Sequence, residues 1–231
     1  MMGFMYYPDY YYVVLVLPAF FLALLAQVSL KSTYKKMSRV FSARGLTGAQ
    51  AALSVLNHYG ITNVSVEPVA GTLSDHFDPR SNVIRLSEGV YASNSIAAIG
   101  IACHEAGHAA QHNENYIPIK IRNAILPVTN LGSALGIPLA IIGYFMSFGP
   151  LIAIGLILYS LVAVFQLVTL PVEFNASSRA IKVIDETGLL NDEEQAGAKK
   201  VLKAAALTYV AALAVTLANL LRLILRFSGR R

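Results

Sequence analysis

The sequence predicts a mainly α-helical membrane protein with several spanning helices and a small α+β part outside the bilayer. Of its 231 residues, 55% are hydrophobic and only 13% are charged, whereas a soluble domain has roughly a quarter charged residues. The mean hydropathy is +0.56. Four uncharged segments approach or reach the about 20 residues that a helix needs to cross the hydrocarbon core. Residues 31–122, in contrast, show the patterns of a globular part.

The predicted spanning helices are residues 11–30, 124–146, 151–170 and 204–221. No basic leader precedes the first, so we interpret it as an anchor rather than a cleavable signal peptide. Only four residues separate the second from the third, which predicts a helical hairpin. The fourth is shorter and has basic residues on both sides. For residues 201–226 a basic amphipathic helix in the membrane interface therefore stays open as a second interpretation.

Basic residues predict how these helices are oriented, because cytoplasmic flanks are enriched in Lys and Arg. They follow the first span, precede the second and follow the third, whereas residues 1–30 and 147–150 contain none. The segments 31–122 and 173–203 are therefore expected to face the cytoplasm. Four arginines do not fit, since a fourth crossing would place them outside: Arg222, Arg226, Arg230 and Arg231. We expect membrane lipids, and not nucleic acid, as partners of the net charge of +5, since basic residues at the ends of spans are typical of topology signals and of contacts with anionic lipids.

The predicted cytoplasmic part 31–122 contains two helices and a small β-hairpin. Thr47 is expected to cap an amphipathic helix over residues 48–59. Valines at 64–69 and the segment 83–86 flank a turn-rich stretch, which we interpret as the hairpin. A second helical pattern begins near Ser93 and runs through Gln111.

This second helix carries the motif H-E-A-G-H from His104 to His108. Histidines four residues apart lie on one face of a helix, where both imidazoles can reach one metal ion. Glu105 can then serve as general base toward a water on the metal. Incidental polar residues are the alternative interpretation, but unpartnered polar groups are costly on so apolar a helix. The motif therefore predicts a site for one Zn²⁺ ion.

Catalytic zinc takes three protein ligands, so a third one is required. His112 lies about 12 Å from His104 along the helix axis, too far for one ion, and is expected at the rim of the site or beside a ligand. Glu173 follows the third predicted span and is the better candidate. From the residues alone, Glu88 and Glu114 compete with it. A solvated carboxylate at a helix start, favoured by the helix dipole, is an equally open interpretation of Glu173.

Three segments, SDHFDPRSNVIRLSEGVY, ACHEAGHAAQH and PVEFNASSRA, occur in this order with the predicted membrane hairpin between the last two. With them the chain resembles, over nearly its whole length, the YugP-type neutral zinc metallopeptidases of bacterial membranes. It is more distantly similar to the HtpX and CAAX prenyl protease type. The resemblance implies a zincin-like metallopeptidase part in which His104, His108 and Glu173 bind zinc and Glu105 is the general base. The implied function is an integral membrane zinc endopeptidase, in the cell membrane with its active site facing the cytoplasm, that cleaves peptide or protein substrates.

The chain departs from the prenyl-protease pattern at Ser177, where an aspartate would hydrogen-bond a ligand histidine. Ser177 can still form such a bond, although a hydroxyl raises imidazole basicity less than a carboxylate does. Asn175 and Asp185 are alternatives for that role. His76 and Arg179 are candidates for stabilising the oxyanion of peptide hydrolysis.

The resemblance also implies an edge strand above the metal helix that pairs with extended substrate. We assign this role to Val83, Ile84, Arg85 and Leu86, whose side chains fit an ordinary core strand equally well. Cys103, the single cysteine, is expected to be a small buried residue without a role.

A non-catalytic membrane scaffold that keeps zinc for structure is the main alternative function. It is disfavoured because a structural site is closed by four protein ligands and needs no base. A zinc transporter would need ionisable residues inside the spans, and the first three predicted spans contain none. Self-association through the apolar hairpin stays open, and the sequence does not identify the substrate.

Overall fold

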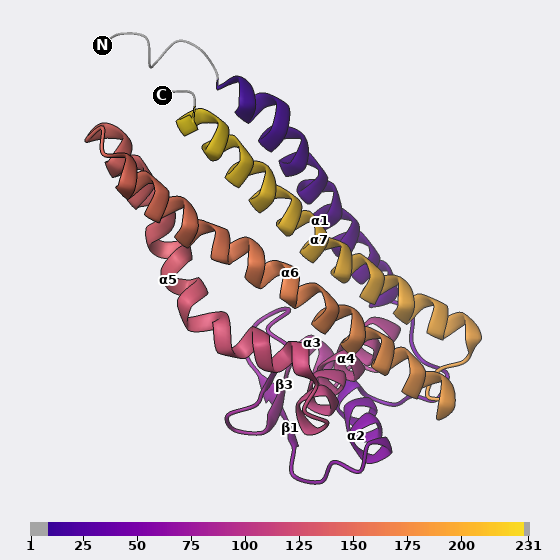
Figure 1. Cartoon of the computed structure of the whole chain (residues 1–231). Helices are drawn as coiled ribbons and strands as arrows, with labels where there is room; N and C mark the ends of the chain where they lie inside the picture. The colour runs from indigo at the N-terminus through magenta and orange to yellow at the C-terminus, as the bar shows by residue number, and fades with distance from the viewer. Residues whose placement is uncertain (1–8, 229–231) are drawn as a thin grey trace. The chain divides into compact units, whose positions relative to one another are not determined.

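The computed structural model describes residues 9–228, which are mainly helical with one small sheet, as predicted (Figure 1). The elements, in chain order, are η1 (Tyr12–Val16), α1 (Leu17–Met37), α2 (Gly48–His58), β1 (Ser65–Val69), β2 (His76–Asp78), β3 (Val83–Ser87), α3 (Glu88–Tyr91), α4 (Ile96–Asn113), α5 (Ile117–Phe145), α6 (Gly149–Glu186) and α7 (Asp192–Ser228).

Four helices in the described part of the chain are long and apolar enough to cross a membrane: Tyr12–Met37, Ile117–Phe145, Gly149–Glu186 and Asp192–Phe227. Large apolar side chains on them are exposed, as lipid-facing residues would be, among them Leu25 and Ile157. The last helix is longer than the predicted segment 204–221. It begins at Asp192, where Glu194 N donates to Asn191 Oδ1 and Asn191 N donates to Glu194 Oε2. This reciprocal cap satisfies backbone donors, so the helix starts before the lysines rather than after them.

Residue contacts divide the chain into two units. The helical unit comprises Met1–Gln27, Ile121–Leu170 and Thr208–Arg231, and the mixed unit comprises Val28–Lys120 and Pro171–Leu207. Helices α1, α6 and α7 each contribute residues to both units.

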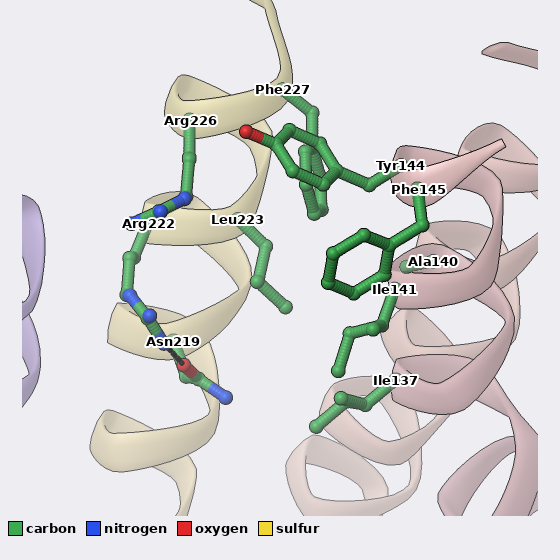
Figure 2. Close-up of a pocket in the computed structure, with 10 residues that line it drawn as sticks. All are labelled: Ile137, Ala140, Ile141, Tyr144, Phe145, Asn219, Arg222, Leu223, Arg226 and Phe227. Carbon is green, nitrogen blue, oxygen red and sulfur yellow. Dashed lines mark hydrogen bonds between the residues drawn. The ribbon is translucent and has the colours of Figure 1, made fainter. Parts of the chain in front are cut away.

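In the helical unit, α5 and α6 form a closely packed helical hairpin. A Cβ atom added at Gly155 would lie 2.5 Å from Ala140 N, and one added at Gly136 would lie 2.8 Å from Tyr159 N. These distances are shorter than any real Cβ contact, so both positions require glycine for the helices to approach. A cavity of about 370 Å³ lies between α5 and α7, with Ile141, Phe145 and Leu223 in its apolar wall (Figure 2).

Two of the arginines that did not fit the predicted orientation are paired within the helical unit. Arg222 Nε and Arg226 Nη1 lie 2.8 Å and 2.6 Å from Asp9 Oδ2. Figure 2 shows both arginine side chains on the side of α7 that faces away from α5. Arg230 and Arg231 lie outside the described residues.

The mixed unit contains a three-stranded sheet in the order β1-β3-β2. β3 pairs in parallel with β1, with Ser65 opposite Val83, and antiparallel with β2, with Phe77 opposite Ile84. The hairpin predicted between residues 64–69 and 83–86 is therefore wrong. The true hairpin joins β2 to β3, and β2 has only three residues, too few to show an alternating pattern.

The core of the mixed unit lies where β3, α2, α4 and α6 meet. Leu56, Ile84, Ile99 and Ile184 are at most 1% exposed. Helix α2 begins as predicted, because Thr47 Oγ1 accepts from Gln50 N and Gln50 Oε1 accepts from Thr47 N. This core supports the helix that carries the H-E-A-G-H motif.

Candidate metal centre

Helices α4 and α6 approach each other closely at Gly107 and Ala176. A Cβ atom added at Gly107 would lie 2.6 Å from Ala176 O, so a larger residue would force the helices apart. Gly107 lies between the two motif histidines, and Ala176 lies between Glu173 and Ser177. The close approach therefore brings the H-E-A-G-H motif against the segment of α6 that follows the third predicted span.

Three metal-ligating side chains converge there. The ligand atoms of His104, His108 and Glu173 all lie within 4.8 Å of one another. Glu173 Oε2 is 3.3 Å from His104 Nε2 and 3.6 Å from His108 Nε2. Glu173 is 3% exposed and His108 is 8% exposed. Two imidazole nitrogens and one carboxylate oxygen form a ligand set of catalytic zinc, so these residues fit the ion.

Glu173 and His108 shift each other's pKa. Burial raises the pKa of Glu173, but the hydrogen bonds and charges of His108 and His104 outweigh it and bring this pKa below its usual range. Burial lowers the pKa of His108, but its contacts with Glu173, Glu105 and Gln111 outweigh that effect, so the pKa is raised. The buried carboxylate of Glu173 is thus stabilised by the two imidazoles beside it.

Glu105 is adjacent to the cluster but is not part of it. The residue is 9% exposed, and its Oε2 accepts a hydrogen bond from Phe77 N of β2 at 3.1 Å. Its charge also acts on His108. The carboxylate is thus held by the backbone of β2, and it is close enough to His108 for its charge to act on that imidazole.

Each histidine has a partner on its second ring nitrogen. His104 Nδ1 lies 3.1 Å from Ser177 Oγ, at the position where the chain departs from the prenyl-protease pattern. His108 Nδ1 lies 3.0 Å from Gln111 Oε1, which sequence reasoning missed. The signal that could have found Gln111 is its spacing, three residues after His108, which places it on the same helix face.

The two alternatives to Ser177 have other partners. Asn175 Oδ1 accepts from Gln111 Nε2 and from Arg179 Nε. Asp185 Oδ1 accepts from Gln195 Nε2. Asn175 is thus linked to His108 through Gln111.

The oxyanion candidates are placed differently from each other. Arg179 Nη1 lies 2.6 Å from Glu114 Oε2, and its guanidinium faces the rings of Tyr59 and Tyr116. His76 is exposed, with Nδ1 2.8 Å from Ser74 O. Neither belongs to the ligand cluster.

The remaining candidates from the sequence also lie apart from the cluster. His112 is exposed at the end of α4 and packs its ring against Phe77. Glu88 is exposed at the start of α3. Cys103 is buried as predicted, and burial raises the pKa of its thiol to about 12, so the thiol stays protonated.

The expectation that Val83, Ile84, Arg85 and Leu86 form an edge strand is wrong. β3 is the central strand, paired with β1 on one side and β2 on the other, and Ile84 and Leu86 are fully buried. The short strand β2 covers the edge that β3 would otherwise offer. β2 is itself an edge strand, and its Phe77 N–H is directed to Glu105 instead of to β3.

Comparisons with known proteins agree with this chemistry. Residues 12–228 match the family model described as "Putative neutral zinc metallopeptidase". The chain is 46% identical over 220 residues to the "Putative membrane protease YugP" of Bacillus subtilis (strain 168), which covers 95% of this chain and 98% of that protein. No solved structure matches the chain significantly. Because the family model spans nearly all of the described residues, the chain belongs to the family of neutral zinc metallopeptidases that it represents.

Proposed function

We propose that this protein is an integral membrane zinc endopeptidase, with one zinc ion per chain held by His104, His108 and Glu173. The observation that carries the proposal is the convergence of these three ligand atoms within 4.8 Å, beside the carboxylate of Glu105. Zinc bound there would supply Lewis-acid polarisation of the scissile carbonyl and would lower the pKa of a water molecule.

Glu105 is the group that moves protons. It takes a proton from the attacking water and delivers it to the leaving amine. The hydrogen bond from Phe77 N fixes one oxygen of its carboxylate, which leaves the other oxygen for the water. A structural zinc site would have no use for such a base.

The strand that binds substrate in this proposal is β2, in place of β3. β2 is the edge strand beside α4, and a peptide that extends the sheet along it would lie next to Glu105. We also propose that the mixed unit has a zincin-like arrangement and that it is distantly similar to the HtpX and CAAX prenyl protease type.

The proposed location is the cell membrane, with several spans and the site on the cytoplasmic side. The four apolar helices support the spans, and the basic residues at their ends support the orientation. Glu173 follows the apolar segment 151–170 by three residues in the same helix, α6. A substrate would therefore be cleaved close to the bilayer surface.

The test is the variant Glu105→Gln in the purified full chain, assayed for zinc content and for cleavage of a peptide library. Zinc content should stay near one per chain, while the cleavage rate should fall by at least about 100-fold, the usual contribution of a general base. Glu88→Gln is the matched control, because Glu88 is exposed and outside the cluster. Equal cleavage by the Glu105→Gln variant and the parent would contradict the assignment of Glu105.

A further inference from the structure

We infer that Gln111 is a positioning residue that fixes the tautomer of His108, so that Nε2 of this imidazole presents its lone pair to the metal. The inference rests on the proposed function, in which His108 is a zinc ligand. Gln111 is not itself a ligand, but it determines which ring nitrogen of His108 carries the proton.

Gln111 is completely buried and uses both ends of its side-chain amide. Its Oε1 lies 3.0 Å from His108 Nδ1. Its Nε2 donates to Val172 O at 2.8 Å and to Asn175 Oδ1 at 2.9 Å. The amide thus joins α4 to the turn of α6 that begins just before Glu173.

The orientation of this amide follows from its partners. The two ends of a glutamine amide have nearly the same shape, so only hydrogen-bonding partners distinguish the oxygen from the nitrogen. Val172 O is a backbone carbonyl and can only accept. The nitrogen of Gln111 must therefore face Val172, and its oxygen must face His108.

The hydrogen bonds of Asn175 give the same orientation for the Gln111 amide. Arg179 has donors and no acceptor, and its Nε donates to Asn175 Oδ1 at 2.8 Å. Asn175 therefore presents its oxygen, which also accepts from Gln111 Nε2. The guanidinium of Arg179 is held in turn by Glu114 Oε2 at 2.6 Å.

The consequence at His108 is a defined proton position. Gln111 Oε1 can only accept, so a neutral His108 carries its proton on Nδ1. Its Nε2 then has a free lone pair on the side of Glu173, whose Oε2 is 3.6 Å away. Metal binding requires this lone pair, so the hydrogen bond to Gln111 selects the tautomer of His108 that binds the metal.

His104 provides an internal contrast. Its Nδ1 faces Ser177 Oγ at 3.1 Å, and a hydroxyl can donate or accept. Ser177 therefore imposes no tautomer on His104. Removal of the partner of His108 should cost more zinc affinity than removal of the partner of His104.

The experiment compares three variants of the purified full chain: Gln111→Met, Gln111→Glu and Ser177→Ala. For each, the zinc Kd is measured by competition with a chelator, and the Tm of the metal-free protein is measured separately. Gln111→Met keeps the side-chain volume but removes the acceptor, so zinc affinity should fall by about 10- to 100-fold. Gln111→Glu keeps an acceptor for Nδ1–H in either protonation state, so its zinc affinity should stay close to that of the parent.

The glutamate variant separates positioning from packing. At neutral pH the ionised glutamate has no donor for Val172 O, so the Tm of the metal-free protein should fall even though zinc affinity is kept. If Gln111 only packed, zinc affinity would follow Tm in both variants. An unchanged zinc Kd in Gln111→Met would overturn this inference and leave the proposed function intact. A loss of zinc affinity in Gln111→Glu as large as that in Gln111→Met would do the same. A parent chain that binds no zinc would overturn the proposed function and this inference with it.

Discussion

Glu173 joins two features that are separate in the sequence, the H-E-A-G-H motif and the end of the third apolar segment. Its Oε2 faces the Nε2 atoms of both motif histidines, and its side chain is almost completely buried. A buried carboxylate is costly unless positive groups compensate it. Either the imidazole protons or a metal ion must therefore balance its charge, which makes the three residues one electrostatic unit.

We predict that the substitution Glu173→Gln weakens zinc binding. An amide is a poorer zinc ligand than a carboxylate and adds no charge, so zinc affinity should fall by more than the about 10- to 100-fold typical of a lost outer-shell partner. Isothermal titration of zinc into the purified chain measures this. Glu114→Gln is the control, since Glu114 is exposed and pairs with Arg179, and it should retain the affinity of the parent. Equal affinities in the two variants would exclude Glu173 as a ligand.

The residues of the candidate site were not equally predictable from the sequence. His104, Glu105 and His108 follow from spacing on one helix, because helical geometry is local. Glu173 required the family resemblance, since 65 residues separate it from His108. The contact from Phe77 N to Glu105 was not predictable, because a backbone donor leaves no signature in the sequence.

At the scale of elements, the crossing of α4 and α6 determines the geometry of the metal centre. For Gly107→Ala we expect a loss of about 1–3 kcal/mol in the free energy of unfolding from overpacking against Ala176 O, with weaker zinc binding. The better helix propensity of alanine offsets up to about 1 kcal/mol. Gly89→Ala supplies that propensity without a clash, since the nearest atom would be 3.8 Å away. Chemical denaturation of both variants measures the difference, and equal stabilities would show that the crossing tolerates a Cβ atom.

The turn between β2 and β3 gives a pH prediction. Hydrogen bonds from Ser81 Oγ, Arg80 N and Arg85 Nη1 lower the pKa of Asp78 from 3.8 to about 2. Because the folded pKa lies below the unfolded one, this stabilisation is complete above about pH 4 and is lost as the pH falls through about 2. The parent should therefore exceed Asp78→Asn in Tm at pH 5, and the difference should shrink toward pH 2. A difference independent of pH would mean that the Asp78 charge does not matter.

The strand prediction failed because of an element too short to detect. Val83–Leu86 was recognisable as a strand, and its buried side chains agree with a core position. Of its two neighbours, β1 was recognisable from the valines at 64–69, but β2 was not, and the pairing of the strands depends on segments elsewhere in the chain. His76–Asp78 lies within a turn-rich stretch, yet it supplies the edge strand and the contact to Glu105.

At the scale of the whole molecule, the proposed orientation predicts which residues can be labelled from outside intact cells. Phe148→Cys lies in the exposed turn between α5 and α6, and Asn57→Cys lies exposed on α2. A membrane-impermeant thiol reagent should label the first in intact cells and the second only after permeabilisation. Cys103 should give no background, because it is buried and its pKa is about 12. The opposite labelling pattern would invert the proposed topology.

The terminal arginines illustrate how tertiary pairing changes a charge argument. Counted along the sequence, Arg222 and Arg226 oppose a fourth crossing. In the structure both contact Asp9 Oδ2, and Arg222 also lies 5.1 Å from the centre of the Tyr12 ring. Asp9 and the arginines are more than 200 residues apart in sequence, so no local pattern could indicate these ion pairs.

The sequence by itself determined the apolar helices of membrane-spanning length, the helical hairpin and the position of two histidines on one face of a helix, because hydropathy and helical spacing are properties of contiguous residues. Only the tertiary structure decided that β3 is the central strand with β2 at one edge of the sheet, and that Gln111 faces His108. It also decided that Gly107 and Ala176 bring Glu173 to the histidines. These features depend on which distant segments pack together, and that is set by the burial and hydrogen bonding of the folded chain as a whole.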